Sequence, residues 1–410
     1  MANAESALAA AVPERSAQGS SRRIQSVDAL RGGVMIVMAI DHIRDFINSS
    51  AMQFSPTDLT RTTTALFFTR WITHFCAPVF AFTAGMSIFL YGRNRSKGQV
   101  SKFLLTRGLW LMLLELTVLR YIMFLEIRFT HTVILLLVIW MLGLSMVVMA
   151  GLVHLPLRVL APLSVAVIAG HNLLDPIPAA KFGKLAWLWD ILHQQAVFQV
   201  YSDNILSAYS LIPWFAVMAA GYCLGTVLLW EPERRRRFLL RLGLALTVAF
   251  VVVRGLNVYG DPAPWSVQHS WWFTALSFLN CTKYPPSLDF LLMTLGPALM
   301  VMAWIERTRF SPKNLLIVFG RVPFFYYVLH LAVIHAVAIA MNFLRYGNTN
   351  FLLIPSPSMG SPRTLFPANF GFSLWVVYAV WIGVILLLYP VCRWYAGLKQ
   401  RRHDWWLSYL

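Results

Sequence analysis

The chain has 410 residues, of which 58% are hydrophobic and only 12% are charged. Soluble domains carry roughly a quarter charged residues, so this composition excludes an ordinary soluble protein. The formal net charge of +17 is a feature of many nucleic-acid-binding proteins. Here, however, the basic residues cluster in short stretches between apolar runs, which is typical of membrane topology and argues against nucleic acid as a partner.

Continuous apolar runs recur along the whole chain, which predicts an all-α, multi-pass transmembrane helical bundle embedded in the lipid bilayer. Residues 1–25 precede the first run; they are small and polar, lack the apolar core of a signal peptide, and are expected to form a disordered cytoplasmic tail. Residues 26–396 form the membrane domain, and residues 397–410 form a basic and aromatic cytoplasmic tail. We expect about ten spans, near residues 28–48, 66–91, 103–125, 131–151, 156–173, 207–230, 238–258, 286–305, 315–343 and 371–394.

The distribution of Lys and Arg predicts the orientation of these spans. With the N-terminus inside, 21 basic residues fall on the inner side and 7 on the outer side. The positive-inside rule therefore places both termini in the cytoplasm. Three long connections, near residues 174–206, 259–285 and 344–370, then face outward, where they either form a substrate entrance or are decoration. The first contains "KLAWLWDILHQQAVF", whose spacing predicts an amphipathic helix at the membrane interface.

The first span, "SVDALRGGVMIVMAIDHIRDF", ends in a cluster of ionisable residues that lipid disfavours. Arg31 begins the span on the inner side, and His42 follows eleven residues later, about 16 Å along a helix. Asp41, His42 and Asp45 share one flank of that helix. A carboxylate beside an imidazole orients the ring and raises its basicity, as a general base requires. The alternative is an interfacial cluster that only caps the outer end of the span.

Further candidate residues lie at similar depth in other spans. In "TRWITHFCAPVFAFTAGMS", Arg70 and His74 fall in the first turns of the second span, and Gly85 allows close helix packing. His74 is equally compatible with a binding site and with a satisfied core position. In the third span, Glu115 and Arg120 are five residues apart, so each is expected to find a structural partner on another helix.

The later spans add a cation, a carboxylate and a histidine. In "CTKYPPSLDFLLMTLGP", Lys283 and Tyr284 are set at the outer boundary by two prolines, and Asp289 lies about one turn deeper. This arrangement suits an anionic or polar ligand, or is simply a helix start. In "FGRVPFFYYVLH", Arg321 lies near the inner side and His330 near mid-membrane, where a lone histidine is often structural.

Four segments, "SVDALRGGVMIVMAIDHIRDF", "RWITHFCAPVFAFTAG", "KYPPSLDFLLMTLGP" and "FGRVPFFYYVLH", resemble the heparan-α-glucosaminide N-acetyltransferase family of transmembrane acyltransferases, in its prokaryote-like branch. The resemblance implies a bundle of ten or eleven helices that transfers an acetyl group from cytosolic acetyl-CoA to a sugar or similar acceptor on the far side. The opening, with Arg31-Gly32 followed by His42, also looks like that of membrane O-acyltransferases that modify surface polysaccharides. The resemblance to the prokaryote-like branch implies that the protein lies in the cytoplasmic membrane of a prokaryote.

One departure from the family concerns the catalytic histidine. In lysosomal members an asparagine occupies the position of His42, and the proposed catalytic histidine lies in the following lumenal segment. Here no histidine occurs between His42 and His74. His42 is matched instead by the histidine of the O-acyltransferase pattern.

The leading hypothesis is therefore an acyl-CoA-dependent O- or N-acetyltransferase with acetyl-CoA as donor and no metal. His42, supported by Asp41 or Asp45, would act as the general base or accept the acyl group covalently. His74 and Lys283 would position the acceptor or stabilise the oxyanion, and Arg70, Tyr284, Asp289 and His330 would contact the substrate. Arg31, Arg93, Arg95 and Arg321 are candidates for binding the CoA phosphates.

The sequence also permits two rival hypotheses for the function. The intramembrane charges would also serve a transporter or lipid-precursor flippase, or a receptor or scaffold. The identity of the acceptor, the acyl chain and self-association into a homo-oligomer are left open by the sequence.

Overall fold

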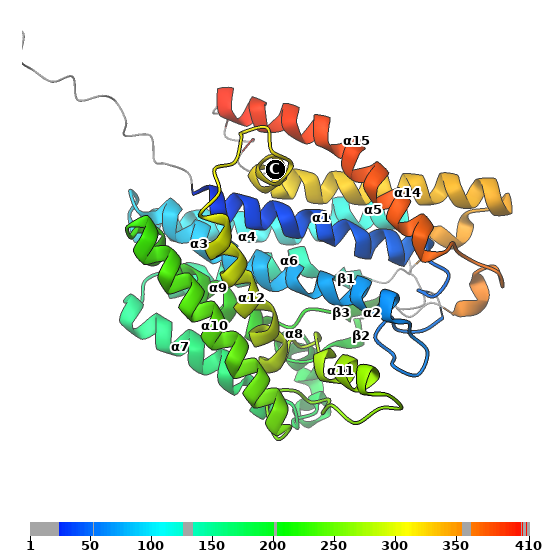
Figure 1. Cartoon of the computed structure of the whole chain (residues 1–410), viewed down its shortest axis with the longest axis horizontal. Helices are drawn as coiled ribbons and strands as arrows, with labels where there is room; N and C mark the ends of the chain where they lie inside the picture. The colour runs from blue at the N-terminus through cyan, green and yellow to red at the C-terminus, as the bar shows by residue number, and fades with distance from the viewer. Residues whose placement is uncertain are drawn as a thin grey trace, which may run out of the picture.

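A computed structural model describes residues 24–51, 53–125, 134–200, 203–354 and 362–402, together with Asp404 and Leu407. Residues 1–23 of the predicted N-terminal tail lie outside the described residues. Most of residues 403–410, in the predicted C-terminal tail, also lie outside them. Residue Gln25, expected to close that tail, already belongs to the first helix. Helices dominate the described chain, and both of its ends lie at the same end of the bundle (Figure 1).

The helices follow the predicted apolar segments in chain order. They are α1 (Gln25–Ile47), α2 (Thr64–Trp71), α3 (Cys76–Gly92), α4 (Lys97–Leu114), α5 (Arg120–Phe124), α6 (Val138–Leu152), α7 (Leu157–Gly170), α8 (Ala186–Leu192), α9 (Leu211–Leu224), α10 (Pro232–Leu256), α11 (Trp271–Leu279), α12 (Leu288–Ile305), α13 (Leu315–Arg321), α14 (Pro323–Tyr346) and α15 (Leu374–Arg401). Short 3₁₀ segments are η1 (Ile72–Phe75), η3 (His171–Leu174), η4 (Ala179–Leu185), η5 (Gly225–Leu229), η6 (Asn350–Leu352) and η8 (Arg363–Leu365), and η2 (Glu115–Leu119) is a π-helix.

Seven continuous helical segments of the described chain are long and apolar enough to cross a membrane. They are Thr64–Gly92, Leu157–Leu174, Leu211–Leu229, Pro232–Leu256, Leu288–Ile305, Pro323–Tyr346 and Leu374–Arg401. The protein is therefore a helical membrane protein, as the sequence predicts. The three other expected spans correspond to α1, to α4 with η2 and α5, and to α6. α1 carries five charged residues, and α6 has only 15 residues, so these segments are not among the seven.

The predicted single span at residues 315–343 is wrong in one respect, because the structure divides it. α13 ends at Arg321, and α14 begins at Pro323 after the non-helical residue Val322. Proline lacks a backbone N–H and fixes its own φ, so it suits the first turn of a new helix and disfavours helical geometry at the preceding residue. The break lets α13 pack against the N-terminal half of α1 while α14 packs against its C-terminal half.

A small sheet, which the sequence reading did not anticipate, lies toward the end of the bundle that is remote from the described chain ends (Figure 1). Strand β3 (Asp203–Ser207) lies between β1 (Ile134–Leu136), to which it is parallel, and β2 (Ala196–Val200), to which it is antiparallel. The register pairs Ile205 with Ile134 on one side and with Phe198 on the other. The amphipathic helix expected in "KLAWLWDILHQQAVF" is accordingly short: α8 ends at Leu192 and β2 follows.

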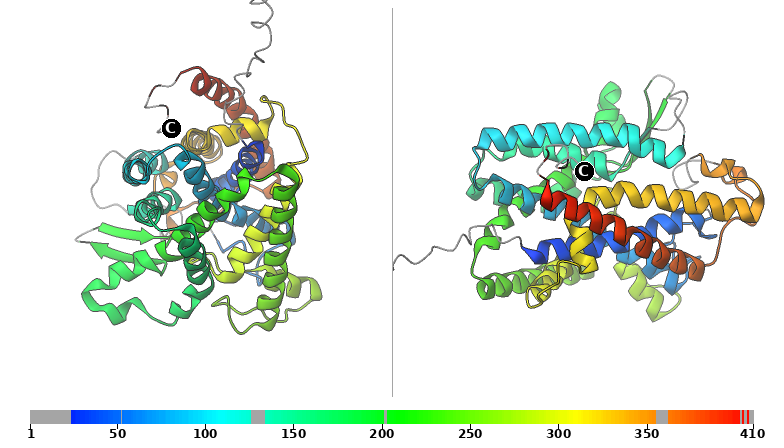
Figure 2. Two further views of the ribbon diagram at one scale, coloured as in Figure 1. Left: turned by 90° about the vertical axis from the view of Figure 1, so that its left-hand side faces the viewer. Right: turned by 90° about the horizontal axis from the view of Figure 1, so that it is seen from above.

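Helix α1 is the centre of the bundle, which the views in Figure 2 also show. It packs against α3, α12, α13, α14 and α15. The crossing with α13 depends on two glycines: a Cβ on Gly32 would overlap the carbonyl of Leu316, and one on Gly320 would overlap the carbonyl of Asp28. Such close backbone approach is how helices gain dispersion energy where lipid provides no hydrophobic driving force.

The structure confirms one expectation for the third predicted span, namely that Glu115 has a structural partner on another helix. Glu115 is buried in the π-helix η2, and its carboxylate accepts hydrogen bonds from the backbone N–H groups of Ile139 (3.0 Å) and Trp140 (3.1 Å). These N–H groups belong to the first turn of α6, where no intrahelical partner exists. Glu115 is therefore a structural cap for another helix, and its carboxyl group lies at the positive end of the α6 dipole.

Adjacent glycines in α1 give a matched test of the helix crossing. We expect Gly32→Ala to lower the thermal unfolding midpoint of the detergent-solubilised protein by several degrees, because the new methyl group forces α1 away from α13. Gly33→Ala is the control, since a Cβ there has no neighbour within 4 Å, and alanine favours a helix over glycine by about 1 kcal/mol. Equal midpoints for the two variants would contradict the packing described.

Candidate functional site

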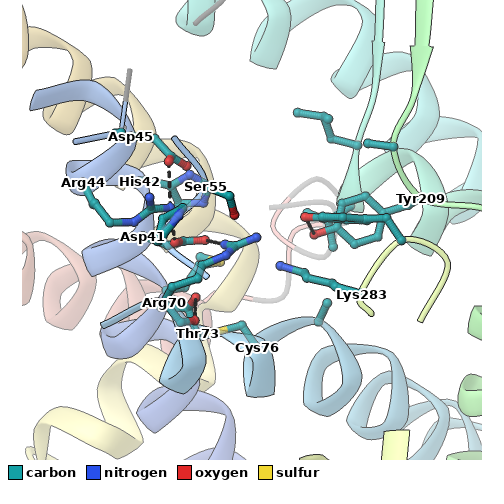
Figure 3. A pocket seen from close by; sticks show the side chains of 18 of the residues that line it. Asp41, His42, Arg44, Asp45, Ser55, Arg70, Thr73, Cys76, Tyr209 and Lys283 are labelled. Atoms are coloured by element: carbon teal, nitrogen blue, oxygen red, sulfur yellow. Dashed lines mark hydrogen bonds and ion pairs between the residues drawn. The ribbon is translucent and has the colours of Figure 1, made fainter. Parts of the chain in front are cut away.

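The C-terminal end of α1 opens into a cavity of about 550 Å³. Its walls come from α1, from the connection to α2, from the α2–η1–α3 segment, from the start of α6, from the residues after β3, and from the residues before α12 (Figure 3). Segments that are far apart in sequence thus contribute side chains to one cavity. Cavities of this size suit a small organic ligand or part of a larger one.

Ion pairs organise the α1 side of the cavity. The Arg44 guanidinium donates to Asp41 and to Asp45, each at 2.8 Å, and Arg70 from α2 forms an ion pair with the other oxygen of Asp41. Arg44 is only 3% exposed, so these contacts lie in a low-dielectric environment where pairing is required. The two carboxylates that the sequence singled out are therefore neutralised by arginines.

His42 projects from α1 between these ion pairs and the core. It lines the cavity, and its ring centre lies 5.2 Å from that of His330 and 6.4 Å from that of Tyr327. Among the described residues, none forms a hydrogen bond with either ring nitrogen of His42. Neither Asp41 nor Asp45 forms the expected hydrogen bond with this ring. Arg44 and Arg70 bind both carboxylate oxygens of Asp41, and Arg44 binds one of Asp45.

Lys283 and two tyrosines form the opposite wall (Figure 3). The Lys283 ammonium lies 5.1 Å from the ring centre of Tyr284 and 5.9 Å from that of Tyr209. The Tyr284 hydroxyl donates to the Tyr209 hydroxyl at 3.4 Å. Burial by itself would raise the pKa of Tyr284, but the Lys283 and Arg70 cations lower it. The wall therefore offers one cation and two phenolic hydroxyl groups to a ligand.

The connection between α11 and α12, which carries Lys283, is fixed by a buried polar network. Asp261 accepts hydrogen bonds from Thr282 through the backbone N–H (2.8 Å) and the hydroxyl (2.7 Å), and from the Ser287 hydroxyl (2.6 Å). Arg254 lies 3.8 Å from Asp261 and is 1% exposed. Its guanidinium also donates to the carbonyls of Ala263, Ser277, Phe278 and Asn280. Lys283 thus lies between Thr282 and Ser287, which are both bound to Asp261.

Of the predicted site residues that do not line this cavity, His74 and Asp289 are buried in the packing around it. His74 is buried against the ring of Phe290, with ring centres 5.3 Å apart, whereas its neighbour Thr73 lines the cavity. Successive helical residues point in different directions, so Thr73 and His74 cannot face the same space. Asp289 is also buried, 3.7 Å from Arg254, and belongs to the network that fixes the connection.

His330 from α14 lies directly behind His42. Its Nδ1 is 2.6 Å from the carbonyl oxygen of Tyr327 and 3.1 Å from that of Tyr326. Because a carbonyl only accepts hydrogen bonds, Nδ1 carries the proton and Nε2 of the neutral ring is an acceptor. That Nε2 is buried and has no hydrogen-bond partner among the described residues. His330 contacts His42 rather than the cavity itself.

The four arginines expected at the CoA phosphates do not line this cavity. Arg31 donates to the Thr83 carbonyl (3.3 Å) and the Ser87 hydroxyl (2.8 Å) on α3. Arg95 donates to the Tyr91 carbonyl (2.8 Å) and stacks on the Tyr91 ring. Arg93 is exposed beyond α3, and Arg321 ends α13. They lie toward the opposite end of the bundle, and the structure does not join them in one site.

Several lining residues escaped the sequence reading. Tyr209 follows β3, so its place depends on the unanticipated sheet, and Tyr327 lies three residues before His330 on α14. Arg44 was visible as a member of the charged cluster, but only the fold shows that it binds both carboxylates. Among the described residues, no group of His, Cys, Asp and Glu is placed to hold a metal ion.

Comparison with known proteins adds independent information. Residues 23–259 match the family model described as heparan-alpha-glucosaminide N-acetyltransferase, catalytic. This region includes α1 and most of the cavity walls but not Lys283 or His330. No curated relative matches the chain. Because the family match covers more than half of the sequence, this helical membrane protein belongs to the heparan-alpha-glucosaminide N-acetyltransferase family of acetyltransferases.

Proposed function

We propose that the protein transfers an acetyl group from acyl-CoA to a hydroxyl or amine of a sugar or related acceptor on the far side of a prokaryotic cytoplasmic membrane. Membership of a membrane acetyltransferase family supports the reaction type. The observation that carries the assignment is the cavity at the end of α1, where His42 presents unoccupied ring nitrogens beside fixed cations. A base next to positive charge is what acyl transfer from a thioester requires.

In the proposed step His42 is the general base. Its unprotonated nitrogen takes the proton from the acceptor O–H or N–H while the acceptor atom bonds to the thioester carbonyl carbon. The C–S bond then breaks, and its electron pair leaves on the CoA sulfur, which receives the proton from His42. Acceptor ester or amide and free CoA are the products, so no further reactant is needed.

The ion pairs around His42 support this role electrostatically. Asp41 and Asp45 are close enough to favour the imidazolium that forms, yet Arg44 and Arg70 keep them from binding it tightly. The proton that His42 takes from the acceptor can therefore pass on to the CoA sulfur. Arg70, with Lys283 and Tyr284 across the cavity, would stabilise the oxyanion or hold the acceptor.

His330 would act as the hydrogen-bond acceptor behind His42. The ring centres lie 5.2 Å apart, so a reorientation of the His42 ring would bring one of its nitrogens within hydrogen-bond reach of His330 Nε2. The buried Nε2 lone pair of His330 would then fix the tautomer of His42 and leave the other His42 nitrogen free to act as base.

Helix α1 would connect the donor side to the acceptor side. Arg31 lies near the inner end and His42 in the outer half, about 16 Å apart along the helix. The inner arginines Arg31, Arg93, Arg95 and Arg321 would bind the CoA phosphates, and the thioester would reach between the helices toward His42.

Replacing His42 tests the reaction directly. We expect His42→Ala and His42→Gln to lower the rate of acetyl-CoA-dependent thiol release by purified protein roughly 100-fold or more, because general-base catalysis contributes about that much. His269→Ala, at an exposed outer histidine, is the control and should retain the wild-type rate.

The outcome also separates the rival function. If acetyl-CoA neither binds the wild-type protein nor changes its thermal stability, acyl transfer is excluded and a transporter becomes the better hypothesis. Covalent acetyl transfer to His42 would instead appear as a burst of CoA release with transient labelling of the protein by acetyl-CoA in the absence of acceptor.

The two carboxylates should differ in importance. Asp41 binds both Arg44 and Arg70 and is 13% exposed, whereas Asp45 binds Arg44 alone and is 31% exposed. We expect Asp41→Asn to lower both kcat and the unfolding midpoint more than Asp45→Asn does, because it leaves buried Arg70 without its carboxylate. Unfolding in detergent and steady-state kinetics measure both quantities. A larger loss in Asp45→Asn would contradict this arrangement.

The role of His330 can be divided between its two nitrogens. An asparagine amide reproduces the Nδ1–H donor, whereas a glutamine amide reaches the position of Nε2. We expect His330→Asn to fold and to lose kcat roughly tenfold or more, and His330→Gln to recover part of that loss. If the two variants have equal kcat, Nε2 does not act on His42.

A further inference from the structure

The charged side chains that line the cavity do not balance. Three are cations, Arg44, Arg70 and Lys283, and two are carboxylates, Asp41 and Asp45. Both carboxylates are bound by the arginines on the α1 side. With His42 neutral, the described lining therefore carries one excess positive charge, and the excess belongs to the opposite wall.

Lys283 is the source of that excess. Its ammonium forms no ion pair or hydrogen bond with any described residue, and its nearest favourable contacts are the rings of Tyr284 and Tyr209. A cation over two aromatic rings regains part of its lost hydration but keeps its donors unused. In Figure 3 the side chain extends into the cavity toward Arg70.

The position of this ammonium is also fixed in advance. Thr282 and Ser287, on either side of Lys283, are both bound to Asp261, which lies beside buried Arg254. Backbone that is anchored on both sides reduces the entropy lost when the side chain binds a ligand. A cation that only ensured membrane topology would not need such support.

We propose that the cavity holds its ligand through an anionic group, a carboxylate, sulfate or phosphate, placed between the Lys283 ammonium and the Arg70 guanidinium. The proposal rests on the proposed function, because it takes the cavity to be where donor and acceptor meet. An acidic sugar acceptor offers this chemistry; the phosphates of acyl-CoA offer it too, in which case they would bind here instead of at the arginines at the other end of α1. Across the cavity from the anion, His42 would face the atom to be acetylated.

Matched ligand pairs test the proposal. Glucuronate has a carboxylate where glucose has a hydroxymethyl group, and acetyl-pantetheine lacks the 3′-phosphoadenosine diphosphate that carries all the phosphates of acetyl-CoA. Dissociation constants for all four probes would be measured on the full chain in detergent, for wild type, Lys283→Gln and Lys283→Arg. Lys184→Gln, at an exposed lysine outside the cavity, is the control.

We expect an anionic probe to bind the wild type more tightly than its uncharged partner, with an advantage that salt reduces. Lys283→Gln should weaken that probe roughly tenfold or more, because a hydrogen bond to a charged group is lost, and leave the partner unchanged. Lys283→Arg should recover most of the affinity, and Lys184→Gln should bind as wild type. A loss for glucuronate identifies the acceptor as the source of the anion; a loss for acetyl-CoA identifies the donor.

Two results would overturn the assignment: no binding of any anionic probe to the wild type, or affinities that Lys283→Gln does not change. Acetyl-CoA turnover is a separate readout. If anion binding depends on Lys283 but no thioester is cleaved, the anion site is supported and the proposed acetyl transfer is wrong. If thioester is cleaved and Lys283→Gln changes neither cleavage nor binding, the acetyl transfer is supported and the anion site is wrong.

Discussion

The paired contact of Arg44 with Asp41 and Asp45 is the interaction on which the cavity depends. Carboxylates at this depth are costly in an apolar environment, and a buried guanidinium with two acceptors offsets that cost with charge-assisted hydrogen bonds. Arg70 adds a second cation to Asp41 and so joins α2 to α1. His42 is thereby placed among compensated charges, where its ring nitrogens stay free for a ligand. Without the arginines, the same carboxylates would bind the imidazole or force the helix end toward water.

The rest of the bundle keeps α1 in this place. Gly32 and Gly320 bring the backbones of α1 and α13 into contact, and the break before Pro323 redirects the chain into α14. That redirection puts His330 behind His42. A continuous helix over residues 315–343 would have to follow one straight line along α1. The close packing at the N-terminal end of α1 and the histidine pair at its C-terminal end are thus two consequences of one break.

The two walls of the cavity are stabilised by different means. The α1 wall is held by ion pairs between side chains, whereas the opposite wall is held by Arg254 and Asp261, which bind backbone groups of the connection before α12. The ion pairs determine the charge around His42, and the Arg254 and Asp261 network determines the position of Lys283. The proposed acyl transfer would need both, because a base is effective only when the reacting atoms are held at a defined distance.

The sequence by itself determined the helical membrane class, the ten apolar segments and the charged end of the first one, since hydropathy and charge are local properties. It also pointed to His42, Arg70 and Lys283, because a charge in an apolar run is visible without a fold. Only the tertiary structure decided which of these side chains meet. His74 and Asp289 turn away from the cavity, Tyr209 enters through a sheet formed by distant strands, and the carboxylates bind arginines instead of the histidine. Such choices depend on helix rotation and long-range packing, which residue spacing along one chain does not specify.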